Sequence, residues 1–183
     1  MFVYTAILLS FASQALGVKS FGRCASPSLQ SSFDVSQYVG TWYEIARDKN
    51  IPFEYGDCTQ ARYASLGGTK ISVHNSLENP NTGAVDSAYA SAKCEGAHCH
   101  VKFFLFYSGD YRVVATDYTS YAIVYSCTDF IFFKSENVWI LSRTETLDST
   151  TLAAAQSTIT TETGYSLDNL YYTVQGGSCA YLS

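Results

Sequence analysis

Two cysteines and two histidines lie close together in the sequence and could support two kinds of chemistry. They occur in the segment CEGAHCH, residues 94–100. A short disulfide could join Cys94 to Cys99 across a loop between strands. Alternatively, Cys94, His98, Cys99 and His100 offer the sulfur and imidazole ligands that suit zinc, although three consecutive ligands fit tetrahedral geometry poorly. This crowding favours the disulfide, so we expect no metal site.

Catalytic chemistry finds little support elsewhere in the chain. No combination of Ser, His and Asp stands out as a triad, and His74 falls on the outward face of a predicted strand. A reactive cysteine would need a free thiol, but every cysteine here can be paired. We therefore expect the protein not to be an enzyme, and a lipid-modifying activity is the least favoured function.

The first residues indicate export. Val3 to Phe11 is an apolar run, and Ala15 and Gly17 provide the small residues of a cleavage site. The run is shorter than the roughly 20 residues that a membrane span needs. We expect residues 1–17 to be a signal peptide and residues 18–183 to be a single secreted, extracellular domain. Six cysteines in an exported chain are typical of disulfides, but fifteen pairings exist and sequence alone does not choose among them.

The composition indicates one globular domain rich in strand-forming residues. The chain has 183 residues, of which 15% are aromatic and 15% charged, and its net charge is −5. This length suffices for one domain with a substantial core. Nucleic acids and anionic membrane surfaces attract a basic face, so neither is expected as the main partner.

Short strands separated by turn residues follow one another along most of the chain. Lys70 to Glu78 shows the clearest alternation, with Ile71, Val73 and Asn75 on one face. Turns are expected at Gly67-Gly68 and Ser108-Gly109-Asp110. Such spacing predicts an antiparallel meander that forms a sandwich or barrel. The predicted strands are 41–45, 58–65, 70–78, 85–92, 101–106, 111–116, 121–127 and 137–142.

The hydrophobic period changes near the C-terminus. Over residues 148–162, Leu152, Ala155 and Ile159 share one helical stripe, and Gly164 follows the last turn. Five threonines in this segment are poor helix formers, so the helix must gain its stability by packing on the sheet. A short closing strand is expected over residues 171–175.

The segment FDVSQYVGTWYEIAR, residues 33–47, is where the strand region begins. Asp34 can cap a short helical turn, because a carboxylate accepts hydrogen bonds from free amides at a helix start. Gly40 allows a sharp bend, and Trp42 lies in the aromatic, β-branched strand that follows. A turn, a glycine and an aromatic strand are typical of the start of a barrel or sandwich.

Three motifs in this order resemble the lipocalin signature. They are Gly40-x-Trp42, Thr116-Asp117-Tyr118 and Arg143 in WILSRTETLD. The resemblance covers almost the whole mature chain and is strongest to the apolipoprotein D-like group, which shares WYEI, ATDY and YAxVYSC. The ending TVQGGSC also resembles crustacyanins and bilin-binding lipocalins.

The resemblance implies an all-β fold, an eight-stranded antiparallel up-and-down barrel with one C-terminal α-helix packed outside. Such a barrel has room for one small ligand. Gly40, Trp42 and Arg143 would form its closed floor, with the guanidinium stacked on the indole ring. These three residues are therefore expected to build the fold and not to touch the ligand.

The resemblance also orders the cysteines and places a ligand site. Matching the apolipoprotein D-like group pairs Cys24 with Cys127 and Cys58 with Cys179, which leaves Cys94 and Cys99 for each other. The ligand-binding positions implied by that group are Tyr63, Asn75 and Trp139. Alternation along the strands adds Val73, Val101, Phe103 and Leu105.

We therefore expect a secreted lipocalin that carries one small hydrophobic ligand, such as a fatty acid, sterol or retinoid, without a further cofactor. The alternative is a pigment-binding protein of the crustacyanin type, holding a carotenoid or bilin. Ile51 and Phe53, in the loop after the first strand, could gate the cavity or contact a membrane or lipoprotein. Scattered apolar residues are also common in exposed loops, so having such a role and having none are equally expected for these two residues.

Overall fold

A computed structural model describes residues 18–103 and 107–182. The expected signal peptide, residues 1–17, and Leu105 lie outside the described residues. No helix in the described part of the chain is long and apolar enough to cross a bilayer.

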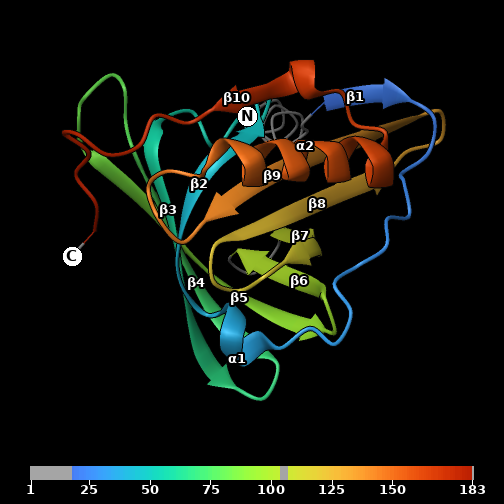
Figure 1. The fold of residues 1–183 in the computed structure, drawn as a ribbon, viewed down its shortest axis with the longest axis horizontal. Coiled ribbons are helices and arrows are strands. Elements are labelled where there is room, and N and C mark those ends of the chain that lie inside the picture. The colour runs from blue at the N-terminus through green and yellow to red at the C-terminus, as the bar shows by residue number, and fades with distance from the viewer. Residues whose placement is uncertain (1–17, 104–106, 183) are drawn as a thin grey trace, which may run out of the picture.

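Eight consecutive antiparallel strands form a closed barrel (Figure 1). Each strand pairs with the next, and the last pairs back with the first, so that Tyr43 lies opposite Ser142 and Arg47 opposite Trp139. Closure satisfies the hydrogen bonds of both edge strands, and the expected barrel is confirmed. The strands are β2 (Gly40–Asp48), β3 (Asp57–Gly67), β4 (Lys70–Glu78), β5 (Val85–Glu95), β6 (His98–Phe103), β7 (Tyr107–Thr116), β8 (Tyr121–Asp129) and β9 (Phe133–Ser142).

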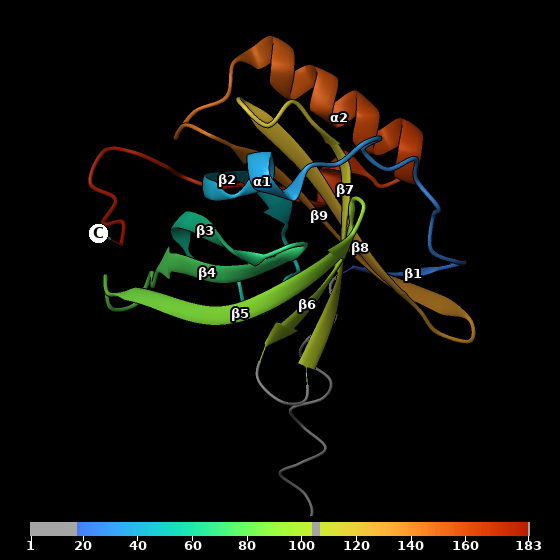
Figure 2. The same ribbon diagram turned by 90° about the horizontal axis from the view of Figure 1, so that it is seen from below.

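Two short strands extend the sheet beyond the barrel. β1 (Val18–Phe21) pairs with the first half of β9, and β10 (Leu170–Tyr172) pairs with the second half of β2. A short 3-10 helix, η1 (Leu167–Asn169), leads into β10. The one-turn helix α1 (Val35–Tyr38) is capped by Asp34, whose side chain accepts a hydrogen bond from the Ser36 amide. Seen from below, α1 lies close to the start of β2 (Figure 2).

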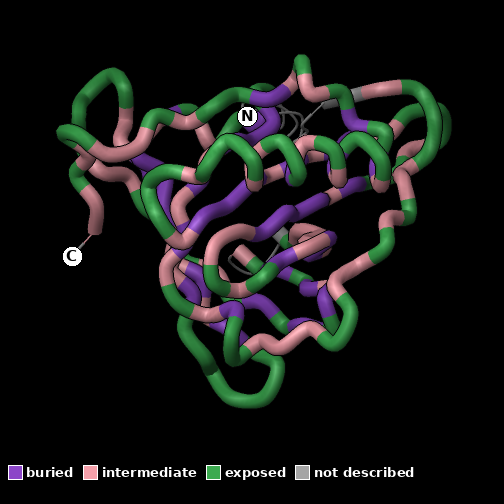
Figure 3. The backbone as a smooth tube through the Cα atoms, in the orientation of Figure 1, coloured by how far each residue is buried: buried purple, intermediate pink, exposed green. Residues whose placement is uncertain are grey.

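The C-terminal helix α2 (Ser149–Thr163) packs against the outside of the barrel. Asp148 caps its start, and Gly164 ends it in the left-handed region with φ of 67°. Ala155 and Ile159 are buried against the outer faces of β8 and β9, which confirms the predicted stripe. Burial follows the strands and the inner side of this helix, whereas most loops are exposed (Figure 3).

Three local expectations were wrong. Residues 94–99 do not form a loop, because β5 runs to Glu95 and β6 starts at His98, leaving a two-residue turn. Ser108-Gly109-Asp110 is not a turn but part of β7, where it pairs with β6. β9 begins at Phe133 rather than at Asn137, since its first residues pair with β8 and β1.

Three disulfides connect the described cysteines. Cys24–Cys127 and Cys58–Cys179 join the two ends of the chain to the barrel wall, over separations of 103 and 121 residues. Cys94–Cys99 links directly opposite positions of the β5–β6 hairpin. Because both of these cysteines are oxidised, they cannot serve as zinc thiolates, and no cluster suited to a metal occurs among the described residues.

Candidate functional site

A stacked tryptophan and arginine close the floor of the barrel. The Arg143 guanidinium carbon lies 3.6 Å from the centroid of the Trp42 ring, which is fully buried. The Trp42 Nε1–H donates to the carbonyl of Tyr38 at 2.8 Å. Arg143 donates to the carbonyls of Thr41 and Tyr118, each at 2.9 Å. These contacts engage the polar groups of both side chains, and the purely structural role of the floor stays a prediction.

Gly40 is required beside this floor. Its φ is 103°, a conformation that residues with a Cβ rarely adopt, and an added Cβ would lie 3.2 Å from Arg143 Nη1. The glycine therefore lets the chain turn into β2 while the arginine passes close to its backbone.

A cavity lies above the floor, inside the barrel. The space that the centre of a water-sized sphere can occupy is about 110 Å³. A single water needs roughly 10–15 Å³ by this measure, so the cavity can take a molecule larger than water. Its walls are mainly apolar, formed by Ala61, Ile71, Val73, Ala92, Val101 and Leu141.

The cavity contains the five positions expected to bind ligand. Tyr63, Val73, Asn75, Phe103 and Trp139 all line it, from strands β3, β4, β6 and β9. The register explains this convergence, because Tyr63 pairs with Val73 and Ala61 pairs with Asn75 across the β3–β4 ladder. Their contact with a ligand stays a prediction.

Phenol groups form one polar end of the cavity. The Tyr63 and Tyr111 hydroxyls lie 3.2 Å apart, and Tyr111 in turn lies 2.8 Å from the Tyr38 hydroxyl. Burial raises the pKa of Tyr63 to about 12, so this hydroxyl stays protonated at neutral pH. The hydroxyls of Tyr63 and Tyr111, which line the cavity, can hold a ligand oxygen or nitrogen as donor or acceptor.

Three polar side chains of the lining have buried atoms without a hydrogen-bond partner. They are Thr59 Oγ1, Asn75 Oδ1 and Asn137 Oδ1. Leaving such a group unpaired costs about 1–3 kcal/mol. A water or ligand in the cavity could bond these atoms and recover part of this cost. These three residues are therefore the expected polar contacts for a bound molecule.

A carboxyl group lies at the other polar end. Trp139 Nε1–H donates to Glu54 Oε2 at 2.7 Å. Glu54 belongs to the segment between β2 and β3, as does Phe53, which lines the cavity and is 45% exposed. Ile51 is only 4% exposed, because its side chain turns into the protein. The expectation that Ile51 contacts a membrane was therefore wrong, whereas Phe53 has the required exposure.

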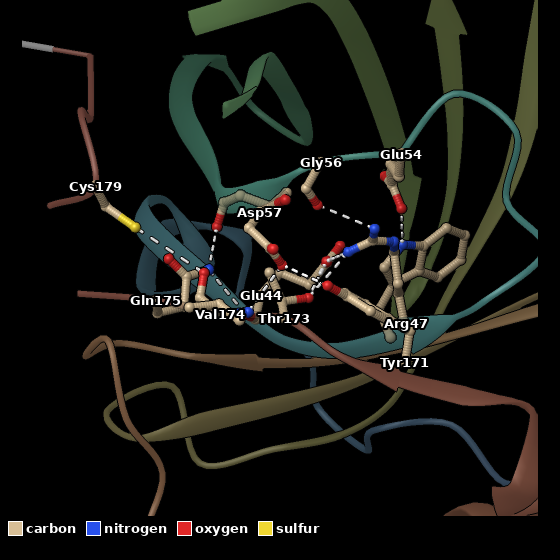
Figure 4. Close-up of polar contacts among 12 residues, drawn as sticks. Glu44, Arg47, Glu54, Gly56, Asp57, Tyr171, Thr173, Val174, Gln175 and Cys179 are labelled. Carbon is tan, nitrogen blue, oxygen red and sulfur yellow. Dashed lines mark hydrogen bonds and ion pairs between the residues drawn. The ribbon is translucent and has the colours of Figure 1, made fainter. Parts of the chain in front are cut away.

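Glu54, which is half-buried, is next to the fully buried carboxyl of Glu44. Glu44 accepts hydrogen bonds from Arg47 Nη1 at 2.6 Å and from the Thr173 hydroxyl, and Arg47 Nη2 donates to the Gly56 carbonyl (Figure 4). Burial raises the pKa of Glu44, and Arg47 opposes this rise. The pKa of Glu54 is raised to about 8 by burial and by the negative charge of Glu44. Glu54 is thus mostly a neutral acid at pH 7.

Sequence reasoning missed these acidic residues. Glu44 follows Trp42 by two positions, so strand alternation alone would have placed it inside the barrel. Glu54 lies outside any strand, and no pattern marks it. Tyr111 was assigned to a strand without a facing direction, although its spacing from Val113 would have placed both inside.

Comparison with known proteins agrees with this geometry. The profile of the lipocalin-like domain family matches residues 33–175. Apolipoprotein D of Rattus norvegicus is 42% identical over 137 residues, covering 72% of this chain and 71% of the relative. Apolipoprotein D of Mus musculus is 36% identical over 191 residues, covering 100% of this chain and 98% of the relative.

Solved structures show the same fold. Lobster apocrustacyanin A1 superposes with a TM-score of 0.78 at 23% identity, covering 88% of this chain and 93% of that one. Insecticyanin of Manduca sexta superposes with a TM-score of 0.76 at 24% identity, covering 89% and 92%. At these identities the superpositions establish architecture only. The family profile and the apolipoprotein D relatives establish that this chain belongs to the lipocalin family.

Proposed function

We propose that this lipocalin is a secreted carrier that binds one small hydrophobic molecule in its barrel. The observation that carries the proposal is the cavity, with its apolar walls and its unpartnered Thr59, Asn75 and Asn137 atoms. Apolar walls favour transfer of a hydrophobic ligand out of water, and a few polar groups orient it.

Binding in this proposal involves no bond making. The cysteine that lines the cavity, Cys99, is held in a disulfide. The phenols of Tyr63 and Tyr111 are kept protonated, because burial raises the pKa of both. Neither group is therefore prepared to act as a nucleophile. Secretion is supported by the apolar N-terminal run in the sequence and by the three disulfides.

Titration with the neutral fluorescent probe N-phenyl-1-naphthylamine tests the proposal. We expect saturable binding at one site per chain, with quenching of Trp139 emission. Val73→Trp, which places a large side chain in the cavity, should weaken binding at least tenfold if about 1.4 kcal/mol of contact is lost. The matched control is Tyr89→Trp, since Tyr89 is an exposed aromatic residue of the neighbouring strand.

The proposal fails if the probe does not bind, or if it binds Val73→Trp as well as it binds the unaltered protein. Organic extraction of purified protein, followed by mass spectrometry, would identify a co-purifying ligand. A visible absorption band in the protein as isolated would instead favour the pigment-binding alternative.

A further inference from the structure

The charged groups of the cavity lining all have the same sign. Glu44, Glu54 and Asp110 line it, and no Lys, Arg or His does so among the described residues. Asp110 is already engaged by His98 and by Arg112, whose nitrogens lie 2.6 and 3.0 Å from its oxygens. The unpaired ionisable group of the cavity is thus one of the two glutamates.

Glu44 already has a cation as its partner. Glu44 is 2% exposed and Arg47 is 4% exposed, and the two form an ion pair at 2.6 Å. Arg47 has no free face, because it also donates to Gly56 and stacks over the Tyr171 ring at 4.6 Å. Arg47 and Glu44 together therefore add no net charge, and within the described part of the chain Glu54 has no basic partner of its own.

Further contacts at this end of the cavity suit a positive charge. The Thr59 side chain is 7% exposed, lines the cavity and has an unpartnered Oγ1. It lies beside Glu44, because the neighbouring residues Tyr43 and Gln60 pair across the β2–β3 ladder. The aromatic rings of Phe53 and Trp139 line the same end. Carboxyl oxygens, a hydroxyl oxygen and aromatic faces are the groups that attract an ammonium ion.

We propose that the glutamate end of the cavity selects hydrophobic ligands that carry a positively charged amine, with Glu54 as the counter-ion, and disfavours ligands that carry a carboxylate. This inference rests on the proposed carrier function. The ammonium group takes the place of the Glu54 proton, which passes to solvent when the ligand binds. A carboxylate ligand would instead lie beside Glu54 and the Glu44–Arg47 pair, whose cation is already engaged, so it would meet a like charge whenever Glu54 is ionised.

The proton balance predicts opposite pH dependences for the two ligand classes. Because the pKa of Glu54 is about 8, roughly 1% of it is ionised at pH 6 and half at pH 8, so amine affinity should rise about 50-fold over this interval. Carboxylate binding should weaken over the same interval. The groups whose charge bears on Glu54 and its neighbours are Glu44 and Arg47 from β2, Asp57 and Tyr63 from β3, and Tyr171 from β10.

A matched series of decylamine, 1-decanol and decanoate tests the inference by displacement of N-phenyl-1-naphthylamine. The three probes share one alkyl chain and differ only in the polar group. We expect decylamine to bind most tightly and decanoate most weakly at pH 8. Glu54→Gln should remove most of the amine preference, lowering the ratio of decylamine affinity to 1-decanol affinity about tenfold. Asp86→Asn is the control, because Asp86 bonds Tyr55 and Asn79 and does not line the cavity.

A measurement on the unaltered protein keeps the test independent of any variant. Calorimetry at pH 7 in two buffers of different ionisation enthalpy should detect about 0.9 protons released per decylamine bound, the fraction of Glu54 that is protonated there. Equal affinities across the series, tighter decanoate binding or no proton release would overturn the inference alone. If none of the three compounds binds, the carrier function itself fails.

Discussion

Replacing Arg47 by methionine should test how much the buried ion pair contributes to the barrel. Arg47 Nη1 bonds Glu44 at 2.6 Å and Thr173 Oγ1 at 3.0 Å, and Nη2 bonds the Gly56 carbonyl at 3.0 Å. These bonds join β2, the β2–β3 loop and the C-terminal segment. Methionine keeps much of the side-chain volume but supplies none of the donors.

The expected loss is large, because Glu44 would be left buried without its cation. Removing one partner of a buried ion pair costs about 3–5 kcal/mol, mostly through the uncompensated charge. Adding Glu44→Gln to Arg47→Met removes that charge. The double variant should therefore regain about half of the stability that Arg47→Met loses. Lowering the pH should also restore part of it, since protonation of Glu44 neutralises the group.

Urea unfolding followed by tryptophan fluorescence measures these differences at pH 7. Arg62→Met is the matched control, because Arg62 lies on the neighbouring strand, is only half-buried and bonds Gln60 alone. It should cost about 1 kcal/mol or less. The reasoning is refuted if Arg47→Met is no more harmful than Arg62→Met, or if adding Glu44→Gln does not improve it.

Three further outcomes follow from the geometry. Arg143→Lys should lower the free energy of unfolding by about 2–4 kcal/mol, because lysine cannot keep both the stacking on Trp42 and the forked hydrogen bonds to the carbonyls. Urea unfolding measures this loss, and an unchanged stability would contradict a structural role for the floor. Replacing the Cys94–Cys99 pair by serines should cost about 2.5 kcal/mol less than replacing Cys24–Cys127 in the chain-entropy model, because the loop it closes is far shorter; equal losses in thermal unfolding would contradict this. The folded pKa of Glu54 is raised from 4.5 to about 8, so the native state holds this proton more tightly and stability should fall as pH rises from about 4.5 to 8. Glu54→Gln should flatten this slope in urea titrations, and an unchanged slope would contradict the assignment.

The architecture was predictable because several independent signals agreed. Alternation along residues 70–78 gave a strand with a defined inner face, and the stripe of Leu152, Ala155 and Ile159 gave the outer helix. The floor formed by Trp42 and Arg143 was predicted because both residues match the lipocalin motifs in order and spacing. Each of these signals is local in sequence or fixed by a motif.

The features that escaped prediction depend on contacts between distant segments. β1 forms because Val18–Phe21 pairs with the first half of β9. Its own residues show no strong strand pattern. The place of Glu54 at the cavity depends on its hydrogen bond with Trp139, 85 residues away, so no local rule marks it. The β5–β6 hairpin was hidden because CEGAHCH contains polar residues that are common in loops, although Cys94 and Cys99 lie directly opposite each other.

The pairing that closes the barrel also sets the order in which the protein can be completed. Tyr43 of β2 can pair with Ser142 of β9 only after about one hundred further residues have been synthesised. Cys58 can pair with Cys179 only when the end of the chain has been made. Until then β2 exposes an unpaired edge, and Cys24 and Cys58 lack their native partners, whereas Cys94 can pair with Cys99 five residues later. Folding should therefore be slow, as for other proteins dominated by non-local pairing. Efficient maturation would depend on an oxidising compartment that can also rearrange early disulfides.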